Sequence, residues 1–214
     1  MKIKYFGHAC FSIDKFIIDP YISKNPNCNA KITDIKSKYI LITHDHHDHI
    51  GDAFEIAKNN DAVIIAMHEI AEKAIESSLQ AEGMNIGGWI RIGGWKIKMV
   101  NAQHSSLTGH PAGFIIKRNK TLYHSGDTGL FSDMTLIGDE GINIAMLPIG
   151  DRYTMGIDDA IKAVGLVRPK VVIPMHYDTF PAIPANPKEF KEKCEKKTMT
   201  RVEIIGYNKE KEFK

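Results

Sequence analysis

The sequence has few cysteines and no long apolar run. Its 214 residues include three cysteines, Cys10, Cys28 and Cys194, which lie far apart and form no C-x-x-C pair. An odd number of scattered cysteines argues against a disulfide framework and is typical of a protein in a reducing compartment. No apolar stretch reaches the length of a membrane span, and residues 1–14 lack the apolar core of a signal peptide. We therefore predict a cytoplasmic protein with no membrane segment.

Neither sign of charge is in excess. Lysine and arginine number 28, aspartate and glutamate number 26, and the formal net charge is +2. Proteins that bind nucleic acids or anionic membranes usually carry a clear basic surplus. A nucleic-acid partner is therefore not favoured, although a small endonuclease stays open as an alternative. No feature of the sequence indicates an oligomeric state.

The chain also lacks low-complexity tracts, internal repeats and linker-like shifts of composition. Its hydrophobic content of 43% is enough for one sizeable core. We therefore predict a single domain that spans residues 1–214.

Short strands and single helices alternate along most of the chain. β-branched and aromatic residues, closed by Gly, Asp or Pro, predict early strands at residues 2–7, 10–14, 16–20 and 39–43. Further strands are predicted at residues 62–66, 95–102, 112–117, 121–126, 142–150, 170–176 and 201–207. Helices are predicted from Ile50 onward, over 68–79, near 131–138, over 157–167, and from Pro187 with Asn186 as cap. This mixture favours sheets whose outer faces are covered by helices.

A dense group of histidines and aspartates follows the strand at 39–43. His44, His46, Asp48 and His49 form the pattern H-x-H-x-D-H. Imidazole and carboxylate groups are the ligands of Zn²⁺ and similar cations. Residues two apart at a strand end can point the same way and share one metal, while the last two residues, at the start of a helix, can serve a second. The alternative is a histidine-rich surface loop, but the position at a strand's C-terminal end favours a site.

Four ligands do not fill two metal sites, so further His or Asp residues are expected at other strand ends. His104 follows the strand at 95–102, Asp127 lies in "HSGDTG", and His176 ends the strand at 170–176. Each alone is also compatible with a surface histidine, a turn aspartate or a strand-end cap. Together they place ligand types at the ends of three separate strands, which indicates one assembled centre.

The order of these motifs resembles the metallo-β-lactamase superfamily, whose pattern is H-x-H-x-D-H, a lone His, a bridging Asp and a final His. The resemblance covers essentially the whole chain, from "GHACF" through "THDHHDH", "NAQHSS", "SGDTG" and "LPIG" to "PMHYDTFP". Through "GHACF", "NIGG", "GDTGLFSDM" and "YTMG" the chain is similar to uncharacterised metal-dependent hydrolases related to ascorbate-6-phosphate lactonase. The resemblance implies an α+β class and a four-layer αββα sandwich, with two mixed sheets face to face and metals at one sheet edge.

The resemblance also implies a role for each ligand and a cofactor of two divalent ions, Zn²⁺ or Mn²⁺, with Fe²⁺ as a third option. One ion is assigned to His44, His46 and His104. The other is assigned to Asp48, His49 and His176, with Asp127 as the bridge. Asp19, at the end of "FIID", matches the aspartate that holds the histidine loop, and a turn residue before Pro20 is equally compatible.

Such a centre is typical of a hydrolase in which a hydroxide between two metals is the nucleophile and Asp48 orients it. We predict a phosphodiester or phosphorylated small molecule as substrate. A lactonase acting on a cyclic ester is one alternative, and a non-catalytic metal-binding scaffold or sensor is another. The complete set of ligands counts against the scaffold. Arg152 is the one obvious candidate for binding phosphate, and it is also compatible with a solvated loop.

The residue that protonates the leaving group is left open by the sequence. His8 in "GHACF" and His124 in "YHSGD" lie at predicted strand ends, and Tyr153 lies in "YTMG". Each is a candidate for substrate binding or proton transfer. Each is also compatible with a hydrogen-bonded structural role.

Overall fold

The computed structural model describes residues 1–214 and contains two seven-stranded sheets. Each sheet belongs to its own compact unit. Unit 1 comprises Met1–Asn85, Ser105–Pro111 and Ile205–Lys214, and unit 2 comprises Ile86–His104 and Ala112–Ile204. None of the helices combines the length and apolar character needed to cross a membrane. The three cysteines, Cys10, Cys28 and Cys194, are free thiols.

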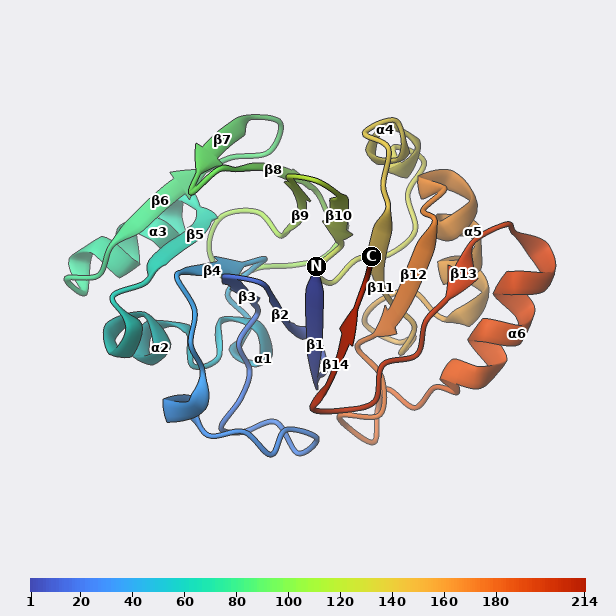
Figure 1. Ribbon diagram of the computed structural model, residues 1–214, viewed down its shortest axis with the longest axis horizontal. Helices are drawn as coiled ribbons and strands as arrows, with labels where there is room; N and C mark the ends of the chain where they lie inside the picture. Colours follow the sequence, from blue (N-terminus) through green and yellow to red (C-terminus); the bar gives the residue numbers. More distant parts are fainter. The chain divides into compact units, whose positions relative to one another are not determined.

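The sheet of unit 1 is mixed and has the order β14-β1-β2-β3-β4-β5-β6. Its strands are β1 (Lys2–Gly7), β2 (Cys10–Ile13), β3 (Phe16–Ile18), β4 (Tyr39–Ile42), β5 (Val63–Met67), β6 (Ala81–Met84) and β14 (Lys209–Glu212). Pairing is antiparallel from β14 to β3 and parallel from β3 to β6. Because β14 pairs with β1, Lys2 lies opposite Glu212 and the two chain ends are neighbours (Figure 1).

The helical segments of unit 1 are η1 (Ile32–Asp34), α1 (His47–Ile50), α2 (Ala53–Asn60) and α3 (His68–Glu76). In Figure 1, α3 lies beside β5 and β6, which it contacts. It buries Ile70, Ala71 and Ala74. Ile75 lies outside this buried face and is 52% exposed.

One continuous helix was expected after the histidine cluster, and the structure divides it at Gly51. This residue has a φ of +41°, and a Cβ there would lie 2.6 Å from the carbonyl oxygen of Pro20. Only glycine combines that backbone conformation with so close an approach. The interruption separates the short helix α1, which carries two ligand candidates, from α2.

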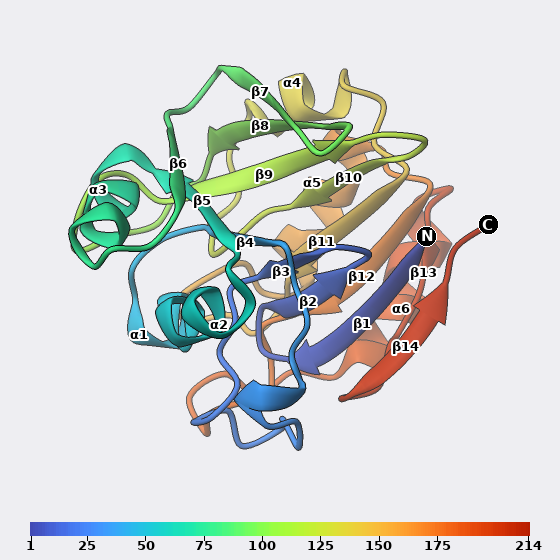
Figure 2. The same cartoon turned by 60° about the vertical axis from the view of Figure 1, so that its left-hand side comes forward.

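The sheet of unit 2 has the order β13-β12-β11-β10-β9-β8-β7. Its strands are β7 (Trp89–Ile92), β8 (Trp95–Asn101), β9 (Ala112–Lys117), β10 (Thr121–His124), β11 (Ile144–Pro148), β12 (Val171–Met175) and β13 (Arg201–Val202). Pairing is antiparallel from β7 to β10 and parallel from β10 to β13. Figure 2 shows β8, β9 and β10 side by side. The parallel part brings the ends of β10, β11 and β12 to one edge, where the ligand candidates of this unit begin.

The helices of unit 2 are α4 (Met134–Gly138), α5 (Ile157–Val167) and α6 (Pro187–Lys197). The range of α5 matches its prediction. The predicted start of α6 is confirmed, because Asn186 Oδ1 accepts hydrogen bonds from the main-chain N–H of Lys188 at 3.0 Å and of Glu189 at 3.3 Å. The mixed sheets and their helices confirm the α+β class.

Three of the four edge strands, β6, β7 and β14, were not predicted. β14 reads Lys-Glu-Lys-Glu and lacks the β-branched and aromatic residues that predict a strand. Charged side chains on an exposed edge strand hinder its pairing with other chains. β7 forms a hairpin with β8 through Gly93 and Gly94, whose φ values of +56° and +80° fit a tight turn.

Gly150 follows β11 at the point where two loops of the unit 2 sheet meet. The N–H of Ile149 donates to the carbonyl of Met175 at 3.1 Å. A Cβ on Gly150 would lie 2.1 Å from the carbonyl oxygen of His176. Main chain cannot yield to that overlap as a flexible side chain can, so the position of His176 requires glycine at 150.

Gly150→Ala should therefore lower the free energy of unfolding by about 3 kcal/mol, the upper range for overpacking. Gly165→Ala is the matched control, because Gly165 lies in α5 and a methyl group on its Cα would have no neighbouring atom within 4 Å. That control should raise the free energy of unfolding by about 0.5 to 1 kcal/mol. Denaturant unfolding followed by circular dichroism measures both. Equal stability of the two variants would contradict the close approach.

Candidate metal centre

The seven ligand candidates fall into one group in each unit. Unit 1 holds the residues of the H-x-H-x-D-H motif: His44, His46, Asp48 and His49. Unit 2 holds the three from separate loops: His104, Asp127 and His176.

The histidine loop, residues 43–49, begins where β4 ends. His46 is the N-cap of α1, and its carbonyl accepts hydrogen bonds from the N–H groups of His49 and Ile50, both at 3.0 Å. The loop therefore changes from extended chain to a helical turn at His46. His44 still follows the strand, whereas Asp48 and His49 lie in the helical turn.

Asp19 is a fully buried carboxylate that organises this loop. Its Oδ1 accepts from the N–H of Thr43 at 2.8 Å, and its Oδ2 accepts from Thr43 Oγ1 at 2.7 Å. The same Oδ2 lies 2.9 Å from His49 Nδ1. An ionised carboxylate is only an acceptor, so this nitrogen carries the proton and His49 Nε2 presents its lone pair. A histidine oriented in this way by a carboxylate is the arrangement found at many metal sites.

The same carboxylate also sets the orientation of His44 through Thr43. Because the Thr43 hydroxyl donates to Asp19, it accepts from His44 Nδ1, which lies 3.0 Å away. His44 Nε2 is then the nitrogen without a proton, and it lies 2.9 Å from His46 Nδ1. Two imidazole nitrogens this close are suited to hold one cation in common.

His8 is the partner of Asp48. Its Nε2 lies 3.0 Å from Asp48 Oδ2, and its ring is fully buried. The backbone of His8 has a left-handed φ of +58°, and its carbonyl accepts from the Tyr5 hydroxyl at 3.0 Å. One ligand atom from each of His8, Asp48 and His49 lies within 4.8 Å of the others. The structure thus brings His8 to the ligand group, where the sequence suggested only a residue that borders it.

In unit 2, Asp127 lies beside both histidines of its group. Its Oδ2 is 2.9 Å from His176 Nε2 and 3.7 Å from His104 Nε2. All three side chains are largely buried, and His176 has a left-handed φ of +55°. One carboxylate oxygen of Asp127 is therefore close to both His104 and His176.

The loops that carry these residues are tied to one another within unit 2. Thr128 Oγ1 accepts from the N–H of Gln103 at 2.9 Å, and the N–H of Gly129 donates to the carbonyl of Gln103 at 2.9 Å. His124 is buried, and its Nδ1 accepts from the N–H of Gly126 at 3.2 Å. His124 therefore supports the turn that leads to Asp127.

The donor set of both units fits a divalent cation. Neutral imidazole nitrogens and carboxylate oxygens are the common ligands of Zn²⁺, Mn²⁺ and Fe²⁺. His44, His49, His176 and Asp127 are buried. Buried carboxylates are costly unless they face positive charge, so a cation is a natural complement to this chemistry.

Tyr153 and Arg152 lie on a loop of unit 2 that follows β11. Tyr153 is 54% exposed, and the guanidinium of Arg152 lies 5.4 Å from the centre of its ring. Asp151 and Arg152 have left-handed φ values of +59° and +49°. Arg152 and Tyr153 are both exposed, so their side chains are available at the surface for contact with a bound molecule.

Asp45 and Asp52 were not identified from the sequence as part of the loop's support. Asp52 Oδ2 accepts from the N–H groups of Ile22 and Ser23, each at 2.8 Å. Burial alone would raise the pKa of the Asp45 carboxyl, but hydrogen bonds from Thr108, Ser106 and main-chain N–H groups outweigh it and hold that pKa well below its usual range. The one sequence signal was the aspartates themselves: Asp45 is the spacer between His44 and His46, and Asp52 follows shortly after the motif.

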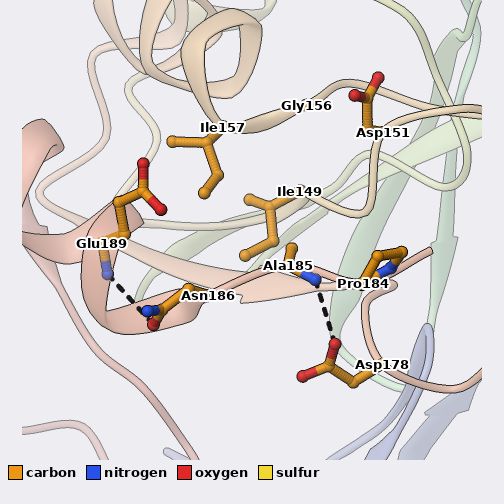
Figure 3. A pocket seen from close by; sticks show the side chains of 9 residues that line it. All are labelled: Ile149, Asp151, Gly156, Ile157, Asp178, Pro184, Ala185, Asn186 and Glu189. Atoms are coloured by element: carbon orange, nitrogen blue, oxygen red, sulfur yellow. Dashed lines mark hydrogen bonds between the residues drawn. The ribbon is translucent and has the colours of Figure 1, made fainter.

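A cavity of about 470 Å³ lies in unit 2 (Figure 3). Its lining includes the apolar side chains of Ile149 and Ile157 and the acidic residues Asp151, Asp178 and Glu189, and no lysine or arginine. Asp178 follows His176 by two residues, and its Oδ1 accepts from the N–H of Ala185 at 3.0 Å. The cavity thus borders the loop that carries a ligand candidate.

Comparison with known proteins agrees with this donor chemistry. A family model described as "Beta-lactamase superfamily domain" matches residues 15–177. A UPF0173 metal-dependent hydrolase of Nanoarchaeum equitans is 48% identical over 226 residues, which cover 100% of this chain and 99% of the relative. One of Pelotomaculum thermopropionicum is 43% identical, with 96% and 97% covered. The solved structure of Igni18, a metallo hydrolase of Ignicoccus hospitalis, has a TM-score of 0.93 and 41% identity, and the match covers 100% of this chain and 99% of that one.

The chain is therefore a metal-dependent hydrolase with the metallo-β-lactamase fold, and the predicted resemblance is confirmed. Within that superfamily it belongs to the UPF0173 metal-dependent hydrolases.

Asp19→Ala should lower the affinity for divalent metal by about 10- to 100-fold, because both His44 and His49 lose the group that fixes their orientation. Competition between the protein and a coloured chelator during titration with Zn²⁺ measures this affinity. Thr43→Ser keeps the relaying hydroxyl and should bind metal like the wild type. If Asp19→Ala binds as tightly as Thr43→Ser, Asp19 is only a turn residue.

Proposed function

We propose that this protein hydrolyses a phosphodiester or a phosphorylated small molecule with two divalent ions, Zn²⁺, Mn²⁺ or Fe²⁺, as cofactors. The first ion would be held by His44, His46 and His104. The second would be held by Asp48, His49 and His176, with Asp127 between the two. Membership of a family of metal-dependent hydrolases supports the reaction type, and the donor set supports the cofactor.

The position of Asp127 is the observation that carries the dinuclear proposal. The same oxygen, Oδ2, is near His176 Nε2 at 2.9 Å and His104 Nε2 at 3.7 Å. The proposal assigns these histidines to different ions. A carboxylate that is close to both is suited to bridge the ions and fix their separation, which such centres require.

When bound, two divalent ions supply an activated water and neutralise charge on the oxygen of the electrophile. Asp48 is the catalytic residue among the side chains, because its carboxylate would orient the attacking water and accept its hydrogen bond. His8, 3.0 Å from Asp48 Oδ2, would fix that carboxylate in one orientation. Because the His8 side chain is fully buried, it suits this role better than donating a proton to the departing leaving group.

The cavity beside the His176 loop is suited to the remote part of the substrate. Its acidic residues would repel a second phosphate, and its isoleucines would contact an apolar group. A phosphodiester with a neutral or cationic leaving group fits these features. The same features favour a lactone as second candidate, since a cyclic ester is neutral and needs no basic residue for binding.

We place this activity in the cytoplasm and on a small molecule. Three free cysteines are compatible with a reducing compartment. A formal net charge of +2 gives no basic surplus for nucleic acid.

Asp127→Ala should remove bound metal and activity together, with a loss in turnover of at least about 100-fold, because a bridging ligand affects both ions. Asp178→Ala is the matched control, since that aspartate supports a loop through the N–H of Ala185 and is no ligand in the proposal. It should keep both ions and most turnover of bis(p-nitrophenyl) phosphate, because this small diester lacks the remote groups that the cavity lined by Asp178 would bind. Elemental analysis and turnover of the same samples measure the pair. Equal loss of activity in both variants, with metal retained, would show that the bridge is misassigned.

The wild type should hydrolyse bis(p-nitrophenyl) phosphate slowly and only with divalent metal, because two ions can bind the non-bridging oxygens during in-line attack. The rate should be low, since this simple diester lacks the remote groups whose binding energy raises turnover. A panel adds simple lactones and a β-lactam, with His46→Ala as the inactive control. Cleavage of lactones alone would replace the first candidate with the second.

A further inference from the structure

Asp45 lies between the ligand candidates His44 and His46, and its carboxylate is directed to a different part of unit 1. Oδ1 accepts from Ser106 Oγ at 2.8 Å, from the N–H of Leu107 at 2.7 Å and from the N–H of Thr108 at 3.3 Å. Oδ2 accepts from Thr108 Oγ1. Four hydrogen bonds to three consecutive residues are more than a turn aspartate usually makes.

A lysine completes this arrangement. Lys73 of α3 donates to Thr108 Oγ1 at 3.0 Å, and its Nζ lies 3.5 Å from Asp45 Oδ2. The Asp45 side chain is only 5% exposed. A buried carboxylate bound by hydroxyl groups, main-chain N–H groups and an ammonium group is a rigid anchor, because losing any one partner leaves charge poorly solvated.

The anchored residues lie directly after His104 in the chain. Residues 102–111 form neither helix nor strand, so their course depends on side-chain contacts. Before His104, Gln103 is held by Thr128 and Gly129. After it, the first fixed residue is Ser106, and the group that fixes it is Asp45.

We infer that Asp45 is a positioning residue for the first metal ion: it fixes residues 106–108, which follow His104 closely in the chain, to the loop that carries His44 and His46. This inference rests on the proposed function, which assigns those three histidines to one ion. Asp45 would contribute no ligand atom. Its effect would be confined to the geometry of one of the two sites, whereas a purely structural residue would affect both sites equally.

Stepwise titration of the metal-free protein with Co²⁺ tests this, with the absorption of each bound ion recorded. The wild type should bind two ions. Asp45→Asn keeps the size of the side chain but gives up the acceptor for Thr108 Oγ1 and Lys73, and should weaken one binding step by about 10- to 100-fold and alter its absorption, with the other step unchanged. Thr108→Val removes the hydroxyl that donates to Asp45 and should weaken the same metal-binding step. Thr108→Ser keeps the hydroxyl and should bind both ions like the wild type.

Asn186→Ala is the stability control. Asn186 also accepts two main-chain N–H groups, and it lies outside every ligand-bearing segment. It should leave both binding steps unchanged. Two unchanged steps in Asp45→Asn and Thr108→Val, or equal weakening of both steps, would overturn the inference. A wild-type protein that binds fewer than two ions would overturn the proposed function as well, so the two failures are distinguishable.

Discussion

The buried negative charge of Asp19 is the constraint on which the histidine loop depends. A carboxylate removed from water must be fully hydrogen bonded, and here the donors are the Thr43 N–H, the Thr43 hydroxyl and His49. Satisfying that charge fixes the proton on one nitrogen of each imidazole. The lone pairs of His44 and His49 are then presented before any metal arrives. A preorganised site of this kind loses little conformational entropy when a cation binds.

Both units place their chemistry by the same rule, although they share no sequence motif. In unit 1 the parallel strand β4 ends at Ile42, just before His44, and in unit 2 the parallel strands β10 and β12 end just before Asp127 and His176. The ends of parallel strands leave main-chain groups and loops at one edge, where side chains can differ without disturbing the core. The ligand candidates therefore lie in loops, and the sheets supply the rigid frame.

The sequence predicted the features that local patterns control. The range of α5 and the Asn186 cap follow from periodicity and capping, and the family resemblance followed from motif order. The edge strand β14 was missed, because the pairing of a charged strand depends on distant neighbours. The anchor at Asp45 was missed for the same reason: its partners are about 60 residues further along the chain.

Three of the eleven non-glycine residues with a left-handed backbone, His8, Asp19 and His176, are ligand candidates or contact them, and their φ values are +58°, +45° and +55°. Each such residue costs of order 1 kcal/mol or more relative to a relaxed backbone. Glycine would relieve that strain, yet it would also delete the imidazole or carboxylate at each position. Mutations meant to raise the free energy of unfolding should therefore leave these three positions unchanged and be placed in the outer helices and at the strand edges.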